Sequence, residues 1–314
     1  MNLNVLIISC SSLFLIASIV SLAQDVDKEF NVTVSSPAYT NNGQKIMVDE
    51  AHYNLSNDDS YEPLFKLLRA DGYTLSFTSS EISSSALQGV NTMIIINPRG
   101  GRYMDKEKVI FQSQECTHLI NWIKNGGSLL LIIDNYYSSS ASKNVTDLLG
   151  VKVGGGVVTD SKNYDKASMR RENLLFSKEN NLLAEHIILK GKDKNESVST
   201  VSSFSGTSLK SINNEYSNLL KFSEYAKESK PDSTWTTGKG LFKQTYVRFV
   251  DPVSVAGLSQ ALAFELGKGR VVFLGDGNML TALVVEGQKQ GMNAGNNHNK
   301  QFALNIMHWL SRKL

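Results

Sequence analysis

The chain has 314 residues, of which 41% are hydrophobic, and its formal net charge is +2. This length and composition can bury a substantial core and are compatible with one large domain or two modest ones. Basic and acidic residues are mixed along the whole length, so neither nucleic acid nor an anionic membrane surface is expected as a partner. Cysteine occurs only at Cys10, near the N-terminus, and at Cys116, so no disulfide is expected inside the folded domain.

The first 23 residues have the pattern of a signal peptide. An apolar run from Val5 to Ala23 closes on Ser21-Leu22-Ala23, and polar residues follow it. Small residues at the first and third of these last positions suit cleavage after Ala23, which predicts an exported protein, periplasmic or extracellular. The run is also long enough to span a bilayer, so a membrane is expected as a partner only if the segment stays uncleaved.

Residues 24–43 are polar and contain the turn signal Asn41-Asn42-Gly43, so they are predicted to be a linker. Residues 44–314 are expected to form one α/β domain. Short apolar runs in its first part alternate with segments of helical periodicity, and this rhythm predicts a doubly wound, mostly parallel sheet. The predicted strands are 45–49, 73–77, 92–96 and 128–134, and the predicted helices are 61–70 and 113–125.

The regular pattern weakens between residues 150 and 254. Polar stretches there are interrupted by short apolar segments, such as 151–153 and 244–250. Because no sustained helical or strand period runs through it, this part is interpreted as a large insertion into the domain.

Regular structure returns after residue 260. Strands at 261–266 and 270–274 are joined by Gly267-Lys268-Gly269, which predicts an antiparallel hairpin at the edge of the sheet. A final helix is expected over 299–312, because apolar residues recur there at helical spacing. These residues are Phe302, Ile306, Trp309 and Leu310.

Five blocks of the domain stand in an order found in a known family. The blocks are Val48-Asp49-Glu50, Ile95-Ile96-Asn97-Pro98, Trp122 to Leu130, Gly267 to Asp276 and Asn305 to Leu310. In their order and spacing they resemble the DUF4350 family, a branch of the class I glutamine amidotransferase-like fold. The resemblance covers residues 44–314 apart from the insertion, and it implies a flavodoxin-like sheet.

The resemblance also implies where a catalytic residue would stand. Class I amidotransferases carry a nucleophilic cysteine on a sharp turn after a central strand, where a downstream histidine helps to activate it. The equivalent strand here runs into Asp134-Asn135-Tyr136, and Cys116 falls on the preceding helix. Glutamine hydrolysis by the Cys-His route is therefore not expected.

Polar and aromatic side chains follow several of the predicted strands. In doubly wound sheets the ligand crevice lies beyond the C-terminal strand ends, and amides and carboxylates suit the hydroxyl groups of a polar small molecule or glycan. The alternative is that Asp134 and Asp276 cap turns and that the amides bond loop backbone. The predicted ligand-binding residues are Glu50, His52, Tyr53, Asn97, Arg99, Asp134, Asn135, Tyr136, Asp276, Asn278, Asn297 and His298.

Three functions remain open at this stage. We favour an exported, non-catalytic module that binds a polar small ligand, with carbohydrate as one such ligand. An alternative is a carboxylate- or metal-assisted hydrolase with Asp134, Asp276, His52 and His298 as catalytic candidates. A further alternative is an envelope scaffold that binds another protein through the insertion. No cofactor is predicted, and no metal site is predicted because the histidines lack ligand spacing.

Overall fold

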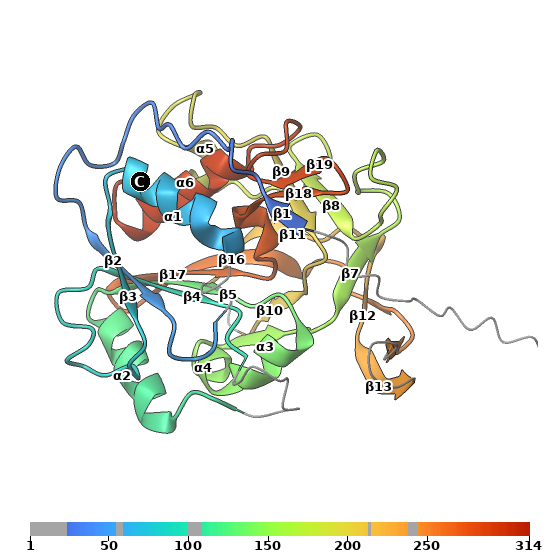
Figure 1. Ribbon diagram of the computed structural model, residues 1–314, viewed down its shortest axis with the longest axis horizontal. Coiled ribbons are helices and arrows are strands. Elements are labelled where there is room, and N and C mark those ends of the chain that lie inside the picture. The colour runs from blue at the N-terminus through green and yellow to red at the C-terminus, as the bar shows by residue number, and fades with distance from the viewer. Residues whose placement is uncertain (1–23, 55–58, 100–108, 213–214, 238–243) are drawn as a thin grey trace, which may run out of the picture.

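The computed structural model describes residues 24–314 except 55–58, 100–108, 213–214 and 238–243. The signal peptide predicted at the N-terminus lies outside these residues. A nine-stranded sheet crosses the centre of the molecule, and helices lie above and below it (Figure 1). No helix in the described ranges is long and apolar enough to cross a bilayer.

One half of the sheet is parallel. Its strand order is β3-β2-β4-β5-β17. Strands β4 and β5 are buried at every residue, as apolar strands in the middle of such a sheet should be. The strands are β2 (Lys45–Asp49), β3 (Thr74–Thr78), β4 (Thr92–Ile96), β5 (Ser128–Ile132) and β17 (Gly269–Leu274).

The other half of the sheet is antiparallel and differs from the prediction. The hairpin of β17 and β16 (Ser259–Leu266) lies inside the sheet, because β10 (Leu209–Ser211) and β6 (Val151–Val153) extend it further. Strand β11 (Ser217–Lys221) also pairs with β16. These added strands come from the expected insertion, and strands of three to five residues carry too little pattern to reveal their pairing.

Helices cover both faces of the sheet (Figure 1). Along β4, Ile94 and Ile96 belong to one core cluster, whereas Met93 and Ile95 belong to the other, as strand alternation requires. The first cluster includes α1 (Glu62–Ala70) and α6 (Asn299–Leu310), and the second includes α2 (Ser113–Lys124). Two short helices, α3 (Tyr136–Ala141) and α4 (Lys143–Leu148), follow β5.

Residues 24–43 are not a linker detached from the domain. Strand β1 (Gln24–Val26) pairs antiparallel with β18 (Ala282–Val285), which pairs in turn with β19 (Gln288–Gly291). The apolar side chains that follow β1 pack against the core next to α1 and α6. The polar composition hides this, because the few apolar residues stand at separated positions. They are Phe30, Val32, Val34, Ala38 and Tyr39.

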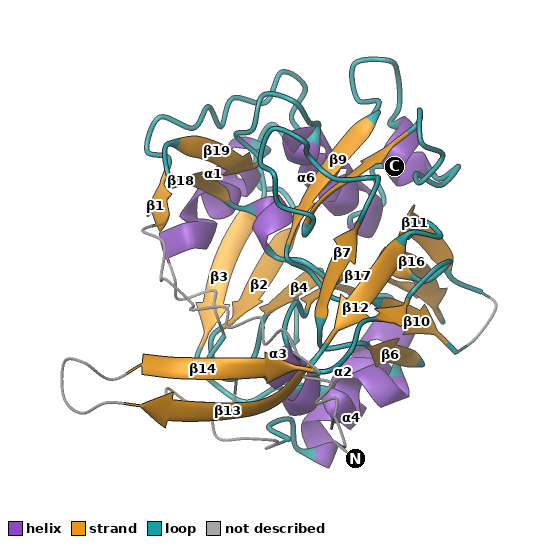
Figure 2. Cartoon of the chain, turned by 90° about the vertical axis from the view of Figure 1, so that its right-hand side faces the viewer, coloured by secondary structure: helices purple, strands orange, loops and turns teal. Residues whose placement is uncertain are grey.

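The rest of the expected insertion forms small sheets beside the main one. The ribbon of β13 and β14 projects from the body of the molecule (Figure 2). A short helix, α5 (Ile187–Lys190), packs against α6. The small sheets consist of β7 (Val157–Asp160), β12 (Ala226–Ser229) and β15 (Val253–Ser254); of β8 (Asn173–Ser177) and β9 (Thr200–Phe204); and of β13 (Pro231–Thr237) and β14 (Gln244–Phe249).

Candidate functional site

A cavity of about 500 Å³ lies at the C-terminal ends of the parallel strands. We call it the strand-end pocket. Five of the predicted ligand-binding residues line it, and they follow three neighbouring strands, β4, β5 and β17. These residues are Arg99, Asp134, Asn135, Tyr136 and Asn278.

Asp134 is held in place at this pocket by its neighbours. Its Oδ2 accepts hydrogen bonds from Asn97 Nδ2 at 2.7 Å and from the Gly277 backbone N–H at 3.2 Å. Its Oδ1 accepts one from Asn135 Nδ2 at 2.8 Å. Asn97 is fully buried and accepts from the Asp134 backbone N–H at 2.9 Å, so it joins the ends of β4 and β5 and orients the carboxylate without lining the pocket.

Glycine at position 277 leaves room for two polar groups close to its backbone. A Cβ atom there would lie 2.1 Å from the Tyr61 hydroxyl and 3.1 Å from Asp134 Oδ2. Because the first distance is shorter than real Cβ contacts, a larger residue would displace the Tyr61 hydroxyl from the pocket wall. Tyr61, in the 3-10 helix η2 (Asp59–Tyr61), lines the same pocket.

Asp276 lies behind the pocket wall. It is fully buried, and it accepts hydrogen bonds from the Phe204 backbone N–H, from Ser203 Oγ at 2.9 Å and from the Asn278 backbone N–H at 2.9 Å. Burial raises the pKa of Asp276 to about 7, against the lowering effect of the Phe204 N–H. Asp276 therefore ties the end of β9 to the turn after β17.

His52 belongs to a separate buried cluster. Its Nδ1 lies 2.8 Å from Asp49 Oδ2, its Nε2 lies 3.1 Å from Glu115 Oε1, and its ring stacks on Phe111 at 4.1 Å. Burial acts to lower the pKa of His52, but the two carboxylates together outweigh burial and raise it. Both ring nitrogens are thus engaged away from the strand-end pocket.

The remaining predicted residues also lie outside the pocket lining. Glu50 is partly buried, and Tyr53 is 60% exposed with a positive φ of 51°. Asn297 Nδ2 donates to the Gly291 carbonyl at 3.2 Å, and His298 Nδ1 lies 3.3 Å from Ser199 Oγ. Of the four catalytic candidates, only Asp134 lines the pocket.

One wall of the pocket comes from residues that the sequence did not single out as ligand-binding. Gly155 and Gly156 line it, and the buried Glu228 carboxylate accepts from the Gly156 N–H at 3.1 Å. The same carboxylate accepts from Thr207 Oγ1 at 2.7 Å. A Cβ at Gly154 would lie 2.2 Å from Glu228 Oε1, so the run of three glycines permits the close approach of Glu228 and was the one signal in the sequence for this wall.

Aromatic rings complete the lining. Tyr61, Tyr136, Tyr137 and Phe249 all line the cavity, and the rings of Tyr136 and Tyr137 meet edge to face at 5.8 Å. Phe249 stands at the base of the projecting ribbon and is 43% exposed. Sequence pattern could not place this residue at the pocket, because it lies more than one hundred residues from Asp134 in the chain.

The one cysteine in the described residues does not stand at the end of a central strand. Cys116 lies on α2 at 1% exposure, and burial raises the pKa of its thiol to about 11. The end of β5 presents Asp134. In the described part of the chain no group of three or more His, Cys, Asp or Glu residues is placed to hold a metal ion.

Fold and pocket together define an α/β protein with a mostly parallel central sheet, antiparallel strands on one side and a polar, aromatic cavity at its strand ends. No family model and no curated protein matches the sequence. Solved structures do resemble it. The mmIFT52 N-terminal domain superposes with a TM-score of 0.59 at 15% identity, over 85% of this chain and 97% of that domain.

Two further solved structures are more distant. A ThuA-like protein from Bacteroides uniformis ATCC 8492 gives a TM-score of 0.43 at 14% identity, over 90% of this chain and 94% of its own. The cytoplasmic protein STM1381 from Salmonella typhimurium LT2 gives 0.44 at 11% identity, over 85% and 99%. At this identity the mmIFT52 match indicates a similar fold alone, and the two lower TM-scores are too low to indicate a shared fold.

Proposed function

We propose that this chain is a non-catalytic binding module that holds a polar, hydroxyl-rich ligand in the strand-end pocket, and that the ligand is a carbohydrate. The supporting observation is the meeting of the Asp134 carboxylate and the Asn135 and Asn278 amides with aromatic rings around one cavity. Carboxylates and amides hydrogen-bond hydroxyl groups, and rings pack against the C–H faces of a sugar.

The size and charge of the pocket agree with this chemistry. Its volume of about 500 Å³ suits a ligand of one or two sugar rings. Arg99 makes no ion pair with any described residue, so its guanidinium is available to donate hydrogen bonds to ligand oxygens. The pocket therefore offers donors and acceptors to the same ligand.

The proposal of binding without catalysis rests on where the other candidates lie. Hydrolysis assisted by carboxylates would need His52, His298 or Asp276 beside Asp134. His52 is enclosed by Asp49 and Glu115, and the Asp276 carboxylate accepts a hydrogen bond from Ser203 on β9. The Asp134 charge contributes to the raised pKa of Asp276, but Asp276 does not line the pocket, so the two carboxylates do not meet in it.

We also infer that the chain belongs with the class I glutamine amidotransferase-like fold and its DUF4350 branch, and that it is exported. The order of the sequence blocks and of the parallel strands supports the first inference, and the apolar run ending at Ala23 supports the second. N-terminal sequencing of the exported protein should give a chain that begins at Gln24, and a chain that retains residue 1 outside the cytoplasm would contradict cleavage.

Calorimetric titration of the purified protein with a panel of sugars tests the function. A bound sugar should stabilise the fold by mass action, by about 2.7 kcal/mol at one hundred times Kd. Asp134→Ala should weaken binding at least tenfold, because it removes an acceptor from the pocket. Asp147→Ala removes the same charge from the exposed face of α4 and serves as the matched control. The proposal fails if no sugar binds, or if the two variants bind alike.

A further inference from the structure

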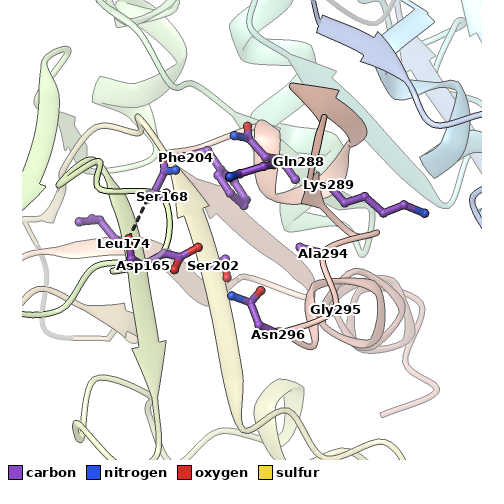
Figure 3. Close-up of a pocket in the computed structure, with 12 residues that line it drawn as sticks. Asp165, Ser168, Leu174, Ser202, Phe204, Gln288, Lys289, Ala294, Gly295 and Asn296 are labelled. Carbon is purple, nitrogen blue, oxygen red and sulfur yellow. Dashed lines mark hydrogen bonds between the residues drawn. The ribbon is translucent and has the colours of Figure 1, made fainter. Parts of the chain in front are cut away.

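A second cavity, of about 420 Å³, lies between the β8–β9 ribbon and the β18–β19 hairpin (Figure 3). We call it the ribbon cavity. None of the residues that line it lines the strand-end pocket. It is a separate cavity, and the function proposed above makes no use of it.

Ser202 has a buried hydroxyl without a partner beside this cavity. Ser202 and Phe204 line it from alternate positions on β9, whereas Ser203 between them donates to Asp276. Ser202 is 3% exposed, and its Oγ has no hydrogen-bond partner among the described residues. A buried hydroxyl left unpaired costs about 1 to 3 kcal/mol, so a partner from outside the chain would offset this cost.

Two further polar groups lie in the lining with unused hydrogen-bonding capacity. Asn173 on β8 is 6% exposed, and its side-chain amide bonds no group in the described part of the chain. Asp165 Oδ1 accepts from the Ala167 backbone N–H at 2.9 Å, and its Oδ2 has no described partner. Figure 3 shows Asp165 and Asn296 on either side of Ser202.

The charge of the lining selects against anions. Lys289 is the one cation among the described lining residues, and its Nζ is paired with Asp27 Oδ2 at 2.9 Å. Figure 3 shows its side chain directed away from Asp165 and Ser202. The Asp165 carboxylate is therefore the unpaired charge at the cavity, and it would repel a ligand carboxylate or phosphate.

We propose that the ribbon cavity is a second binding site, which takes a small neutral polyol or monosaccharide. Asp165 accepts from the ligand's hydroxyl groups, Asn173 donates and accepts, and Ser202 gains the partner that it lacks. The Phe204 ring offers an apolar surface to the ligand's C–H groups.

Gly295 provides a clean way to block the cavity. It lines the cavity, and a Cβ atom there would meet no other atom within 4 Å. Gly295→Trp should fill the space without removing any contact of the folded chain, and Gly295→Ala is its matched control. Ser202→Ala, which removes the unpaired hydroxyl and adds no atom, is a second variant that does not depend on steric block.

The test titrates the purified protein with myo-inositol, glucose and glucuronate, and compares it with four variants. Wild type and Gly295→Ala should bind at least one neutral ligand with equal affinity, and Asp134→Ala should keep the part of this binding that Gly295→Trp removes. Gly295→Trp and Ser202→Ala should lose at least tenfold in affinity, and glucuronate should bind at least tenfold more weakly than glucose.

Three results overturn the proposal. They are unchanged binding in Gly295→Trp, glucuronate binding as tight as glucose binding at this site, and no neutral ligand bound, which would mean that the cavity holds water alone. Binding that Asp134→Ala abolishes and Gly295→Trp leaves intact would support the strand-end pocket while overturning the second site.

Discussion

Asp134 and Asp276 show how one residue type acquires two roles at the same edge of a sheet. Both follow a buried parallel strand, and both were candidates for ligand binding. Asp134 keeps a place in a pocket lining, whereas Asp276 is enclosed because the Phe204 backbone arrives from the expected insertion and donates to it. The local sequences, Ile133-Asp134-Asn135 and Gly275-Asp276-Gly277, carry no trace of that difference.

The raised pKa of Asp276 predicts that stability depends on pH. The ordinary pKa of this carboxyl is 3.8, and burial raises it to about 7 in the folded chain. Because the folded state then binds the proton more tightly than the unfolded state, the contribution of Asp276 is complete below pH 3.8 and is lost as the pH rises towards 7. Urea midpoints between about pH 4 and pH 8 should therefore fall in the wild type and fall less in Asp276→Asn.

His52 acts in the same direction and needs its own control. Its raised pKa gives a contribution that is present at low pH and lost as the pH rises through its folded value. Comparing His52→Gln with the double variant His52→Gln, Asp276→Asn isolates Asp276. Parallel pH profiles for these two proteins would show that Asp276 does not titrate between the two pKa values.

At the scale of elements, regular structure with strong periodicity was predictable. The strands at 45–49 and 92–96 and the helices α1, α2 and α6 are confirmed to within a few residues. Their apolar residues recur at the period of one buried face, or run unbroken where both faces are buried, so pattern alone fixes them. Strands β6 and β10 could not be placed in this way, because a strand of three residues pairs by tertiary proximity.

The predicted pocket residues were likewise predictable only where they follow parallel strands. Arg99, Asp134, Asn135, Tyr136 and Asn278 stand directly after parallel strands, and topology brings such positions together. Most of the aromatic and glycine lining comes from η2 and from the expected insertion, including its β13–β14 ribbon. Local sequence pattern does not predict where these segments lie. Asn297 and His298 precede α6 rather than follow a parallel strand, and the structure places them elsewhere.

Residues 24–43 should be needed for stability although their composition resembles a linker. Phe30, Val32, Val34 and Tyr39 pack against the core, and Lys300 Nζ donates to the Asn31 carbonyl at 2.7 Å. A protein that begins at residue 44 should lose about 3 kcal/mol or more of unfolding free energy relative to one that begins at residue 24.

Urea unfolding followed by circular dichroism measures this difference. A protein that begins at residue 28 lacks β1 but keeps the apolar residues, and it separates strand pairing from core packing. Equal stability of the proteins that begin at residues 24 and 44 would show that residues 24–43 act as a linker.

At the scale of the whole molecule, the strand-end pocket joins distant parts of the chain. Gln24 lines it from β1, Asp134 from the centre of the sheet, Phe249 from the β13–β14 ribbon and Asn278 from the turn after β17. No contiguous fragment contains all of these walls except almost the entire described chain. A ligand bound there is therefore expected to stabilise the fold as a unit.

The end of β9 has a consequence for how the two cavities relate to each other. Phe204 lines the ribbon cavity, and the adjacent Ser205 lines the strand-end pocket. Asp276 accepts a hydrogen bond from the Phe204 N–H. A ligand that displaced this peptide on one side would also move the lining of the other cavity. If the two affinities are coupled, thermodynamic reciprocity requires the same factor in both directions. The affinity at each cavity would then depend on whether the other cavity is occupied, so the protein would respond to its two ligands together.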